Sequence, residues 1–297
     1  MLNRRTLLAH GAAMGGMAAF GHMLPAWAHS GTAGVPPTLP TLSGNDIALQ
    51  IGHSRFTVGG RTGNAITING TVPAPLLRLR EGETFRIAVT NTLEEDTSIH
   101  WHGFLIPFDM DGVPGVSFPG IRPRETFVYE LPIRQSGTFW YHSHSGLQEQ
   151  LGHYGPITID PATPDPVAYD REHVLVLSDW SFMDPHRIMN QLKQEGGHFN
   201  RQNLTLSGLF RRNDPEQDMS LEDRTMWAKM RMDPTDISDV TGAIYTFLVN
   251  GHGPQENWTG LFRPGERVRL RIINASAMTV FQVRIPGLGM TVVNADG

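Results

Sequence analysis

Two short motifs place pairs of imidazole side chains at a spacing that suits metal binding: His100-Trp101-His102 and His142-Ser143-His144. Successive residues of a β-strand point to opposite faces, so residues two apart point to the same face. On strands, each motif presents two imidazoles on one side, with its middle residue on the other. Neutral imidazole binds copper, zinc, iron and nickel. If the two strands are neighbours, four imidazoles converge in a metal site; the alternative is surface histidines or hydrogen-bonded polar pairs. The candidate ligands are His100, His102, His142 and His144.

The composition narrows the chemistry further. The chain has 297 residues, 39% of them hydrophobic and 18% charged, which is typical of a globular protein with a packed core. It contains no cysteine, which excludes a disulfide framework, a thiolate zinc site, an iron–sulfur cluster and a cysteine nucleophile. A blue-copper centre also needs a cysteine thiolate, so this chain cannot form one by itself. The formal net charge of −5 gives no indication of nucleic-acid binding.

Short runs of β-forming residues alternate with turn residues through the first half of the chain. With 32 Gly and 21 Pro, the composition favours an all-β protein with many turns over a helical bundle. Several short strands at this spacing predict a β-sandwich or a barrel. The expected strands are Ile47–Ile51, Ala65–Ile68, Thr84–Thr90, Ser98–His102, Glu125–Leu131, Gly137–His142 and Gly155–Ile159.

An internal repeat indicates two copies of one domain. Residues 81–91 resemble residues 264–274 at an offset of 183, and Asn69-Gly70 is matched by Asn250-Gly251 at an offset of 181. The proline-rich run 161–166 predicts the linker between the copies. We therefore expect a first domain over residues 45–162 and a second over 163–297. The second carries an insertion at about 180–240 with helical stretches, expected at Arg187–Lys193 and Leu221–Met232.

The same offset shows what the second copy lacks. Position 297 corresponds to position 114, so nothing in the second copy matches residues 115–160. A sandwich without its last strands has open edges and half a core, so either the chain is a fragment or something else completes it. His100 and His102 map to Val283 and Ile285, on a strand that we expect the second copy to keep. The histidines are therefore specific to the first copy and are not required by the fold.

The first 28 residues have the order of an export signal. Arg4-Arg5 precedes a weakly apolar segment, and Ala26-Trp27-Ala28 supplies a cleavage site between small residues. The adjacent arginines predict a twin-arginine signal peptide, and hence export to the periplasm by the twin-arginine machinery. The alternative is a membrane anchor, but a span needs about 20 apolar residues, so we expect no stable membrane anchor. Residues 29–44 then predict a linker.

Two stretches carry a resemblance to a known family. Residues 99–115 and 137–150, which contain the two His-x-His motifs, resemble the first cupredoxin domain of a multicopper oxidase. With residues 184–187 and 257–265, the whole chain after the signal is similar to the periplasmic copper-resistance branch of that family. The resemblance implies tandem cupredoxin-like Greek-key β-sandwiches, of which the second is incomplete and carries the insertion.

The resemblance further implies a three-domain copper enzyme of copper resistance. Such an enzyme takes electrons one at a time from a substrate at a type 1 copper, and a trinuclear copper cluster uses four of them to reduce dioxygen to water. By motif position, His100 is a ligand of the type 2 copper, and the type 3 pair is held by His102, His142 and His144. Asp111 aligns with a carboxylate that balances charge and relays protons behind the ligands; the alternative is a plain Asp-Gly turn. The implied substrate is Cu(I), with phenols as accessory reductants.

The chain departs from the family pattern after His144. The remaining cluster ligands and the type 1 site belong to a C-terminal cupredoxin domain, but no later His-x-His and no cysteine occur here. We therefore expect half a cluster without an electron entry site, which does not turn over alone. Two alternatives remain: a non-catalytic periplasmic protein that binds and sequesters copper, and a cupredoxin scaffold without metal. The later histidines are scattered, at His153, His173, His186, His198 and His252.

A methionine cluster is the last candidate for copper chemistry. Met226, Met230 and Met232 lie near Trp227 on an expected helix. Soft thioethers could hold Cu(I). Methionine more often fills a core, which is the interpretation we favour.

Overall fold

The computed structural model describes residues 39–199, 220–230 and 242–297. The expected signal peptide, 1–28, and residues 29–38 of the expected linker lie outside the described residues. Among the residues that are described, no helix is both long enough and apolar enough to cross a membrane.

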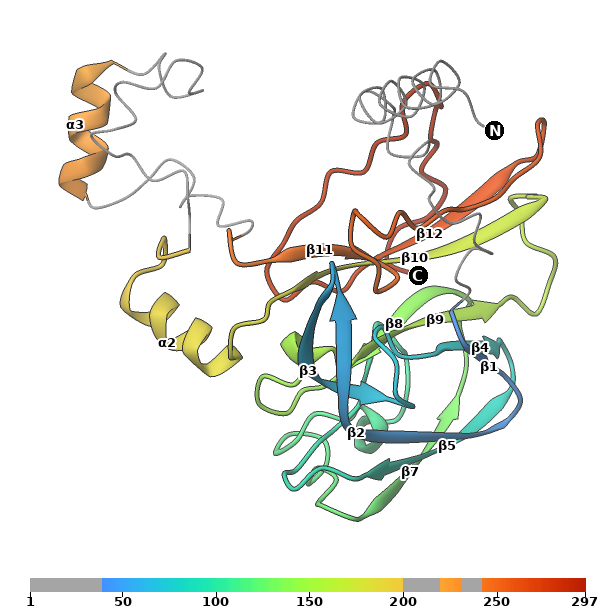
Figure 1. The fold of residues 1–297 in the computed structure, drawn as a ribbon. Helices are drawn as coiled ribbons and strands as arrows, with labels where there is room; N and C mark the ends of the chain where they lie inside the picture. Colours follow the sequence, from blue (N-terminus) through green and yellow to red (C-terminus); the bar gives the residue numbers. More distant parts are fainter. Residues whose placement is uncertain (1–38, 200–219, 231–241) are drawn as a thin grey trace, which may run out of the picture.

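The first part of the chain folds as two β-sheets packed face to face (Figure 1). One sheet has the order β1-β4-β9-β8-β6, and the other has the order β3-β2-β5-β7. The described chain is built mostly of strands, which confirms the all-β class. The first sheet consists of β1 (Thr41–Leu42), β4 (Leu76–Arg80), β6 (His100–His102), β8 (Gly137–His142) and β9 (Tyr154–Asp160). The second consists of β2 (Asp46–Val58), β3 (Arg61–Ile68), β5 (Thr84–Asn91) and β7 (Thr126–Pro132).

Alternating burial along the strands places a hydrophobic core between the two sheets. In β2, Ile47, Leu49 and Ile51 are buried, while the residues between them are exposed. The same core takes Trp101 from β6 and Tyr129 from β7, both with no exposed surface. Because the burial of apolar side chains is the main driving force of folding, this core holds in place the sheet that carries both His-x-His motifs.

The structure differs from the sequence prediction at the edge of the five-stranded sheet. The sequence does not predict β4, because Leu76–Arg80 contains no β-branched or aromatic residue of the kind that marks strands. Thr41–Leu42, expected to belong to the linker 29–44, pairs in parallel with Leu76–Leu77 as β1. The linker prediction is therefore wrong for these two residues, whose backbone groups are part of the sheet.

A three-stranded sheet repeats part of the first sandwich. β10 (Arg171–Trp180) lies between β11 (Thr246–Val249) and β12 (Val268–Asn274). β10 pairs antiparallel with β11 and parallel with β12, just as β2 pairs with β3 and β5. The register also agrees, because Asp46 faces Arg86 in one sheet and Glu172 faces Arg269 in the other.

The two Asn-Gly turns are alike in atomic detail. Asn69 and Asn250 both have a φ of 52°, in the left-handed region that asparagine tolerates. The side-chain oxygen of Asn69 accepts a hydrogen bond from Gln50 N at 2.7 Å, and that of Asn250 accepts one from Val176 N at 2.7 Å. Each asparagine thus ties a turn to the central strand of its sheet, which explains why the pair recurs in the sequence.

The second copy does not keep the strand expected at Val283 and Ile285. Residues 275–297, all of which are described, form no β-strand. In the first copy the equivalent strand, β6, is held by antiparallel pairing with β8. The offset of 183 would place a counterpart of β8 beyond residue 297. Without a partner for its N–H and C=O groups a strand does not form, so this expectation is wrong.

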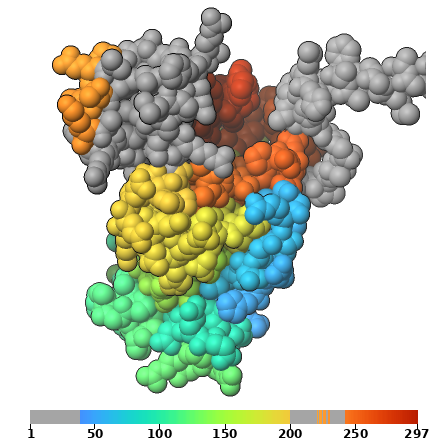
Figure 2. All heavy atoms as spheres, turned by 60° about the vertical axis from the view of Figure 1, so that its left-hand side comes forward, coloured from blue at the N-terminus to red at the C-terminus, as the bar shows by residue number. Residues whose placement is uncertain are grey.

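Two helices lie in the described part of the expected insertion. α2 (Pro185–Gln194) begins at Asp184, whose carboxylate accepts a hydrogen bond from Arg187 N at 3.0 Å, as an N-cap does. α3 spans Leu221–Met230. Residues 181–184, which lead into α2, line a cleft of about 740 Å³ together with residues of β2 and β3. Figure 2 shows the yellow part of the chain, which includes α2, at the surface beside the blue N-terminal strands.

The methionine cluster is only partly described. Met226 lies on α3 and is 47% exposed. It therefore does not pack in a core, contrary to the interpretation that we favoured. The side chain of Met230, and all of Met232, lie outside the described residues.

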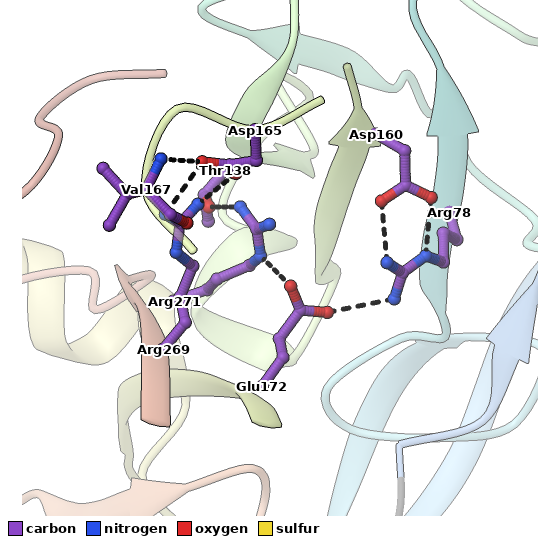
Figure 3. A network of polar contacts seen from close by, with 8 residues as sticks. All are labelled: Arg78, Thr138, Asp160, Asp165, Val167, Glu172, Arg269 and Arg271. Carbon is purple, nitrogen blue, oxygen red and sulfur yellow. Dashed lines mark hydrogen bonds and ion pairs between the residues drawn. The ribbon is translucent and has the colours of Figure 1, made fainter. Parts of the chain in front are cut away.

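A network of ion pairs joins the three-stranded sheet to the first sandwich (Figure 3). Glu172 on β10 accepts hydrogen bonds from Arg78 on β4 at 3.0 Å and from Arg271 on β12 at 2.6 Å. Arg78 also donates to both carboxylate oxygens of Asp160 on β9, and Arg271 donates to Thr138 on β8. The side chains of Glu172 and Arg271 are 13% and 6% exposed. Glu172 is thus a shielded link between the two sheets.

A hydrophobic core lies at the same junction. It combines Val176 and Trp180 of β10 and Leu248 of β11 with Ala65 of β3 and Tyr154 of β9. The three-stranded sheet is therefore fixed to the sandwich by apolar burial as well as by charge.

Replacing Glu172 by alanine should lower the free energy of unfolding by about 3 kcal/mol, because Arg271 then stays buried without its charged partner. Urea denaturation followed by tryptophan fluorescence measures the loss. Glu94→Ala is the matched control, because Glu94 pairs with Arg124 where the two side chains are 81% and 80% exposed. An exposed pair contributes less than about 1 kcal/mol, and equal losses for the two variants would contradict the role of the network.

Candidate metal centre

Antiparallel pairing of β6 with β8 brings the two His-x-His motifs together. His100 faces His142 across the pair of strands, and His102 faces Trp140. Side chains of directly opposed residues are close enough to touch, so the imidazoles of the two motifs meet on one face. His144 follows the end of β8, and its N–H donates to the Ser98 hydroxyl at 3.0 Å. This hydrogen bond holds His144 beside the start of β6.

The middle residues of both motifs point into the interior, as the sequence predicts. Trp101 packs against the rings of Tyr129 and Tyr141, at centroid distances of 5.1 and 5.9 Å. The Ser143 hydroxyl donates to Gln148 Oε1 at 2.9 Å, and both side chains are buried. The interior therefore holds the backbone of both motifs from behind the histidines.

The four histidines form one cluster. One ring nitrogen from each of His100, His102 and His142 lies within 4.8 Å of the other two. The ring centroid of His144 lies 4.6 Å from that of His100 and 5.0 Å from that of His142. Within the part of the chain that the structure describes, no second group of three His, Cys, Asp or Glu side chains converges in this way.

The main chain of Asp111 orients His100. Its carbonyl oxygen lies 2.8 Å from His100 Nδ1, whereas its nearer carboxylate oxygen lies 3.4 Å from the same nitrogen. A carbonyl can only accept, so Nδ1 carries the proton and Nε2 keeps a lone pair for a metal. The chain after Asp111 passes close to the residue before β6, and this requires a glycine at position 112. Gly112 has a φ of 79°, and a Cβ there would collide with the carbonyl oxygen of Ile99.

Glu149 orients His142 through its side chain. Its Oε2 lies 2.7 Å from His142 Nδ1, and a carboxylate can only accept, so the proton is on Nδ1. His142 Nε2 lies 3.3 Å from His102 Nδ1. Two nitrogens bound to one ion at about 2.0–2.1 Å and a tetrahedral angle lie about 3.3–3.4 Å apart. The two nitrogens therefore fit a shared ion, and imidazole donors suit copper.

Trp140 supports the same two imidazoles. Its indole ring stacks on His142 at a centroid distance of 4.1 Å and on His102 at 5.0 Å, with interplanar angles of 12° and 29°. Offset stacking is a favourable arrangement of aromatic rings. It limits the rotation of both imidazoles and so favours the ring positions that face each other.

Burial favours the neutral form of two of the candidate ligands. It lowers the pKa of His102 and of His144 below the usual value of 6.5, and the neighbouring His142 and His100 rings lower both further. A neutral imidazole offers the lone pair that a metal needs. The cluster is therefore prepared to bind a cation near neutral pH.

His153, which the sequence leaves among the scattered histidines, lies directly behind the cluster. Its carbonyl oxygen accepts a hydrogen bond from Ser143 N at 3.1 Å. Its ring has no exposed surface, and neither ring nitrogen has a hydrogen-bond partner. Burial lowers its pKa to about 3, with a smaller contribution from His142. His153 is therefore a neutral side chain behind the ligands.

Sequence reasoning also missed Trp140 and Glu149. Trp140 lies two residues before His142 on β8, so the same-face rule for strands would have placed its ring beside that imidazole. Glu149 reaches His142 from the short 3₁₀ helix η3 (Glu149–Leu151). No spacing in the sequence marks that contact.

Comparison with known families identifies the chain. Two family models, each described as multicopper oxidase, match residues 50–164 and 171–297. The chain belongs to the multicopper oxidase family. This result agrees with the cluster of imidazoles, which are ligands that suit copper.

Two relatives that resemble almost the whole chain are copper resistance proteins. The chain is 50% identical over 297 residues to copper resistance protein A of Escherichia coli, a match that covers 99% of this chain and 48% of the relative. It is 52% identical over 275 residues to the copper resistance protein A homolog of Pseudomonas syringae pv. tomato, a match that covers 92% and 46%. The chain thus spans about half the length of the curated relatives it matches.

Solved multicopper oxidases share the fold. The blue copper oxidase from Nitrosomonas europaea aligns with a TM-score of 0.55 and 26% identity, over 78% of this chain and 61% of that structure. The laccase from Botrytis aclada aligns with a TM-score of 0.54 and 30% identity, over 82% and 39%. These alignments confirm the predicted cupredoxin-like β-sandwich fold.

Replacing Gly112 by alanine should lower the free energy of unfolding by about 3 kcal/mol or more, because the new Cβ overlaps main-chain atoms that cannot move without displacing β6. Gly115→Ala is the matched control. Gly115 has a φ of 75° but open space around it, so its variant should lose only the roughly 1–2 kcal/mol of backbone strain. Thermal unfolding of both variants measures the difference, and equal losses would show that the approach of Gly112 to Ile99 is not tight.

Proposed function

We propose that this chain is the N-terminal part of a periplasmic copper-resistance oxidase, which couples the one-electron oxidation of Cu(I) to the reduction of dioxygen to water. The observation that carries the proposal is the convergence of four imidazoles at the β6–β8 pair, with two ring nitrogens 3.3 Å apart. The names of the two relatives support a role in copper resistance.

In this proposal His100 binds the type 2 copper, and His102, His142 and His144 bind the type 3 pair. The facing nitrogens of His102 and His142 support one shared ion for these two ligands. Bound copper supplies redox states that accept electrons singly and a place for dioxygen reduction. Asp111, with a carboxylate oxygen 3.4 Å from His100 Nδ1, balances positive charge and passes protons toward the cluster.

The proposed enzyme needs a further domain. Residues 45–162 form the first cupredoxin domain, and residues 163–297 form part of a second. The remaining cluster ligands and the type 1 copper belong to a C-terminal cupredoxin domain, because a type 1 site needs a cysteine and this sequence has none. A signal peptide over residues 1–28 sends the protein to the periplasm by the twin-arginine machinery.

A second candidate function is copper sequestration without electron transfer. The absence of cysteine from all 297 residues favours it, since the described residues provide imidazoles for an ion but no site for electron entry. In this case the same four histidines hold copper as cargo.

Copper stoichiometry and activity distinguish the two functions. For the 297-residue chain loaded with Cu(II) and passed through a desalting column, the oxidase proposal predicts less than one retained copper per chain. It also predicts no blue absorption and no oxygen uptake with Cu(I), because half a ligand set leaves each ion short of donors. One or more retained copper ions would instead support sequestration.

Titration with Cu(II), followed by electron paramagnetic resonance, locates the ion in either case. The double variant His100→Ala, His142→Ala should lower the copper affinity by about tenfold or more, because it removes two donors. His186→Ala is the control, since this residue lies on α2 in the insertion. An unchanged affinity in the double variant would refute the candidate metal centre.

A further inference from the structure

Glu149 is a carboxylate in direct contact with the histidine cluster. We propose that Glu149 is the positioning residue of His142: it holds the proton of that imidazole on Nδ1 and thereby directs Nε2 toward the ion shared with His102. The inference rests on the proposed copper site and adds to it a group that neither the motifs nor the family resemblance indicated.

The contact between Glu149 and His142 is short and sheltered. Oε2 lies 2.7 Å from Nδ1, whereas the competing acceptor, the carbonyl oxygen of Ser143, lies 3.2 Å away. The side chains of His142 and Glu149 are 8% and 28% exposed. A hydrogen bond to a charged acceptor is about twice as strong as one between neutral groups, and exclusion of water strengthens it further. Both acceptors face Nδ1, and the carboxylate is the closer and the stronger of the two, so it contributes most to keeping the proton on that nitrogen.

The chain around Glu149 holds it in place from both sides. Gln148 is buried, and its side chain accepts from the Thr97 hydroxyl at 2.7 Å and donates to Glu95 at 3.0 Å. Gln150 donates to the carbonyl oxygen of Asp179 on β10 at 3.3 Å. The η3 helix is thus attached to both the sandwich and the three-stranded sheet. Glu149 loses little conformational freedom on binding His142, as a preorganised group should.

Asp111 provides an instructive contrast. It orients His100 through its main-chain carbonyl, at 2.8 Å, and its side chain is the more distant acceptor. A substitution at residue 111 therefore leaves the main acceptor of His100 in place. A substitution at residue 149 removes the closer acceptor of His142 and leaves only the longer contact of Nδ1 with the Ser143 carbonyl oxygen.

The consequence for copper is electronic as well as geometric. A carboxylate that accepts the Nδ1 proton makes the opposite nitrogen a better donor, and loss of such a partner typically lowers metal affinity about 10–100-fold. Glu149→Ala should therefore weaken copper binding without removing any ligand. Glu149→Gln keeps an oxygen that accepts from Nδ1, so it should lose less than about tenfold.

Two measurements on the 297-residue chain test the proposal. Nitrogen-15 NMR of the metal-free protein reports which ring nitrogen of His142 is protonated. We expect the Nδ1–H form in the parent chain and in Glu149→Gln. In Glu149→Ala, where only the longer contact with the Ser143 carbonyl remains, we expect a larger fraction of the Nε2–H form than in the parent chain. Competition with a chelator of known affinity then gives the Cu(II) affinity, for which we expect the order parent, Glu149→Gln, Glu149→Ala.

Glu94→Gln is the matched control. It removes one negative charge from a side chain that is 81% exposed and pairs with Arg124, outside the contacts that hold Glu149. We expect it to leave both the tautomer and the copper affinity unchanged. Similar losses in Glu94→Gln and Glu149→Gln would point to overall charge and overturn the positioning role.

The outcomes separate this inference from the proposed function. If Glu149→Ala keeps the parent tautomer and copper affinity while the His100→Ala, His142→Ala variant loses copper, the metal centre stands and the role of Glu149 is refuted. If the His100→Ala, His142→Ala variant keeps the parent copper affinity, the proposed function fails. The tautomer of His142 in the metal-free protein then still shows whether Glu149 positions that ring. Glu149→Gln preserves the shape of the side chain and guards against a folding defect in Glu149→Ala.

Discussion

The antiparallel pairing of β6 with β8 is the contact on which the candidate metal centre depends. β6 contains only the residues of one His-x-His motif, so its three residues must both pair with β8 and present the ligands. A slip of one residue would turn Trp101 outward and the imidazoles inward. Burial of Trp101 against Tyr129 and Tyr141 opposes that slip, because the apolar ring would lose its place in the core.

The groups behind the ligands complete the centre. Main-chain atoms of Asp111, the carboxylate of Glu149 and the indole of Trp140 each restrain an imidazole, by a hydrogen bond or by stacking. Such outer contacts matter because a metal needs a particular nitrogen of each ring, at a particular distance. Through the hydrogen bond of Gln150 to Asp179 the restraint extends to β10, so the three-stranded sheet contributes to a site to which it gives no candidate ligand.

The internal repeat separates the requirements of the fold from those of the chemistry. β10, β11 and β12 reproduce the pairing and register of β2, β3 and β5, including the asparagine that closes each turn. The His-x-His motifs occur only in the first copy, and at an offset of 183 Val283 and Ile285 of the second copy correspond to His100 and His102. The shared strands thus serve stability, while the ligands are carried by elements that the second copy does not form in the described residues.

The sequence by itself determined the all-β class, most strands of the first sandwich and the four imidazoles, because strand alternation and two-residue spacing are local properties. It did not reveal β4, because Leu76–Arg80 lacks the residue types that mark strands. It also missed the pairing of Thr41–Leu42, because a two-residue edge strand depends on the neighbour to which it bonds. It wrongly predicted a strand at Val283, where the tertiary structure supplies no partner. The sequence did not indicate Glu149 and His153, which reach the cluster only in the folded chain. Their contacts with His142 and Ser143 do not follow from strand alternation or from any motif spacing. Residue type and strand spacing therefore indicated the candidate ligands, and long-range packing decided which groups orient them.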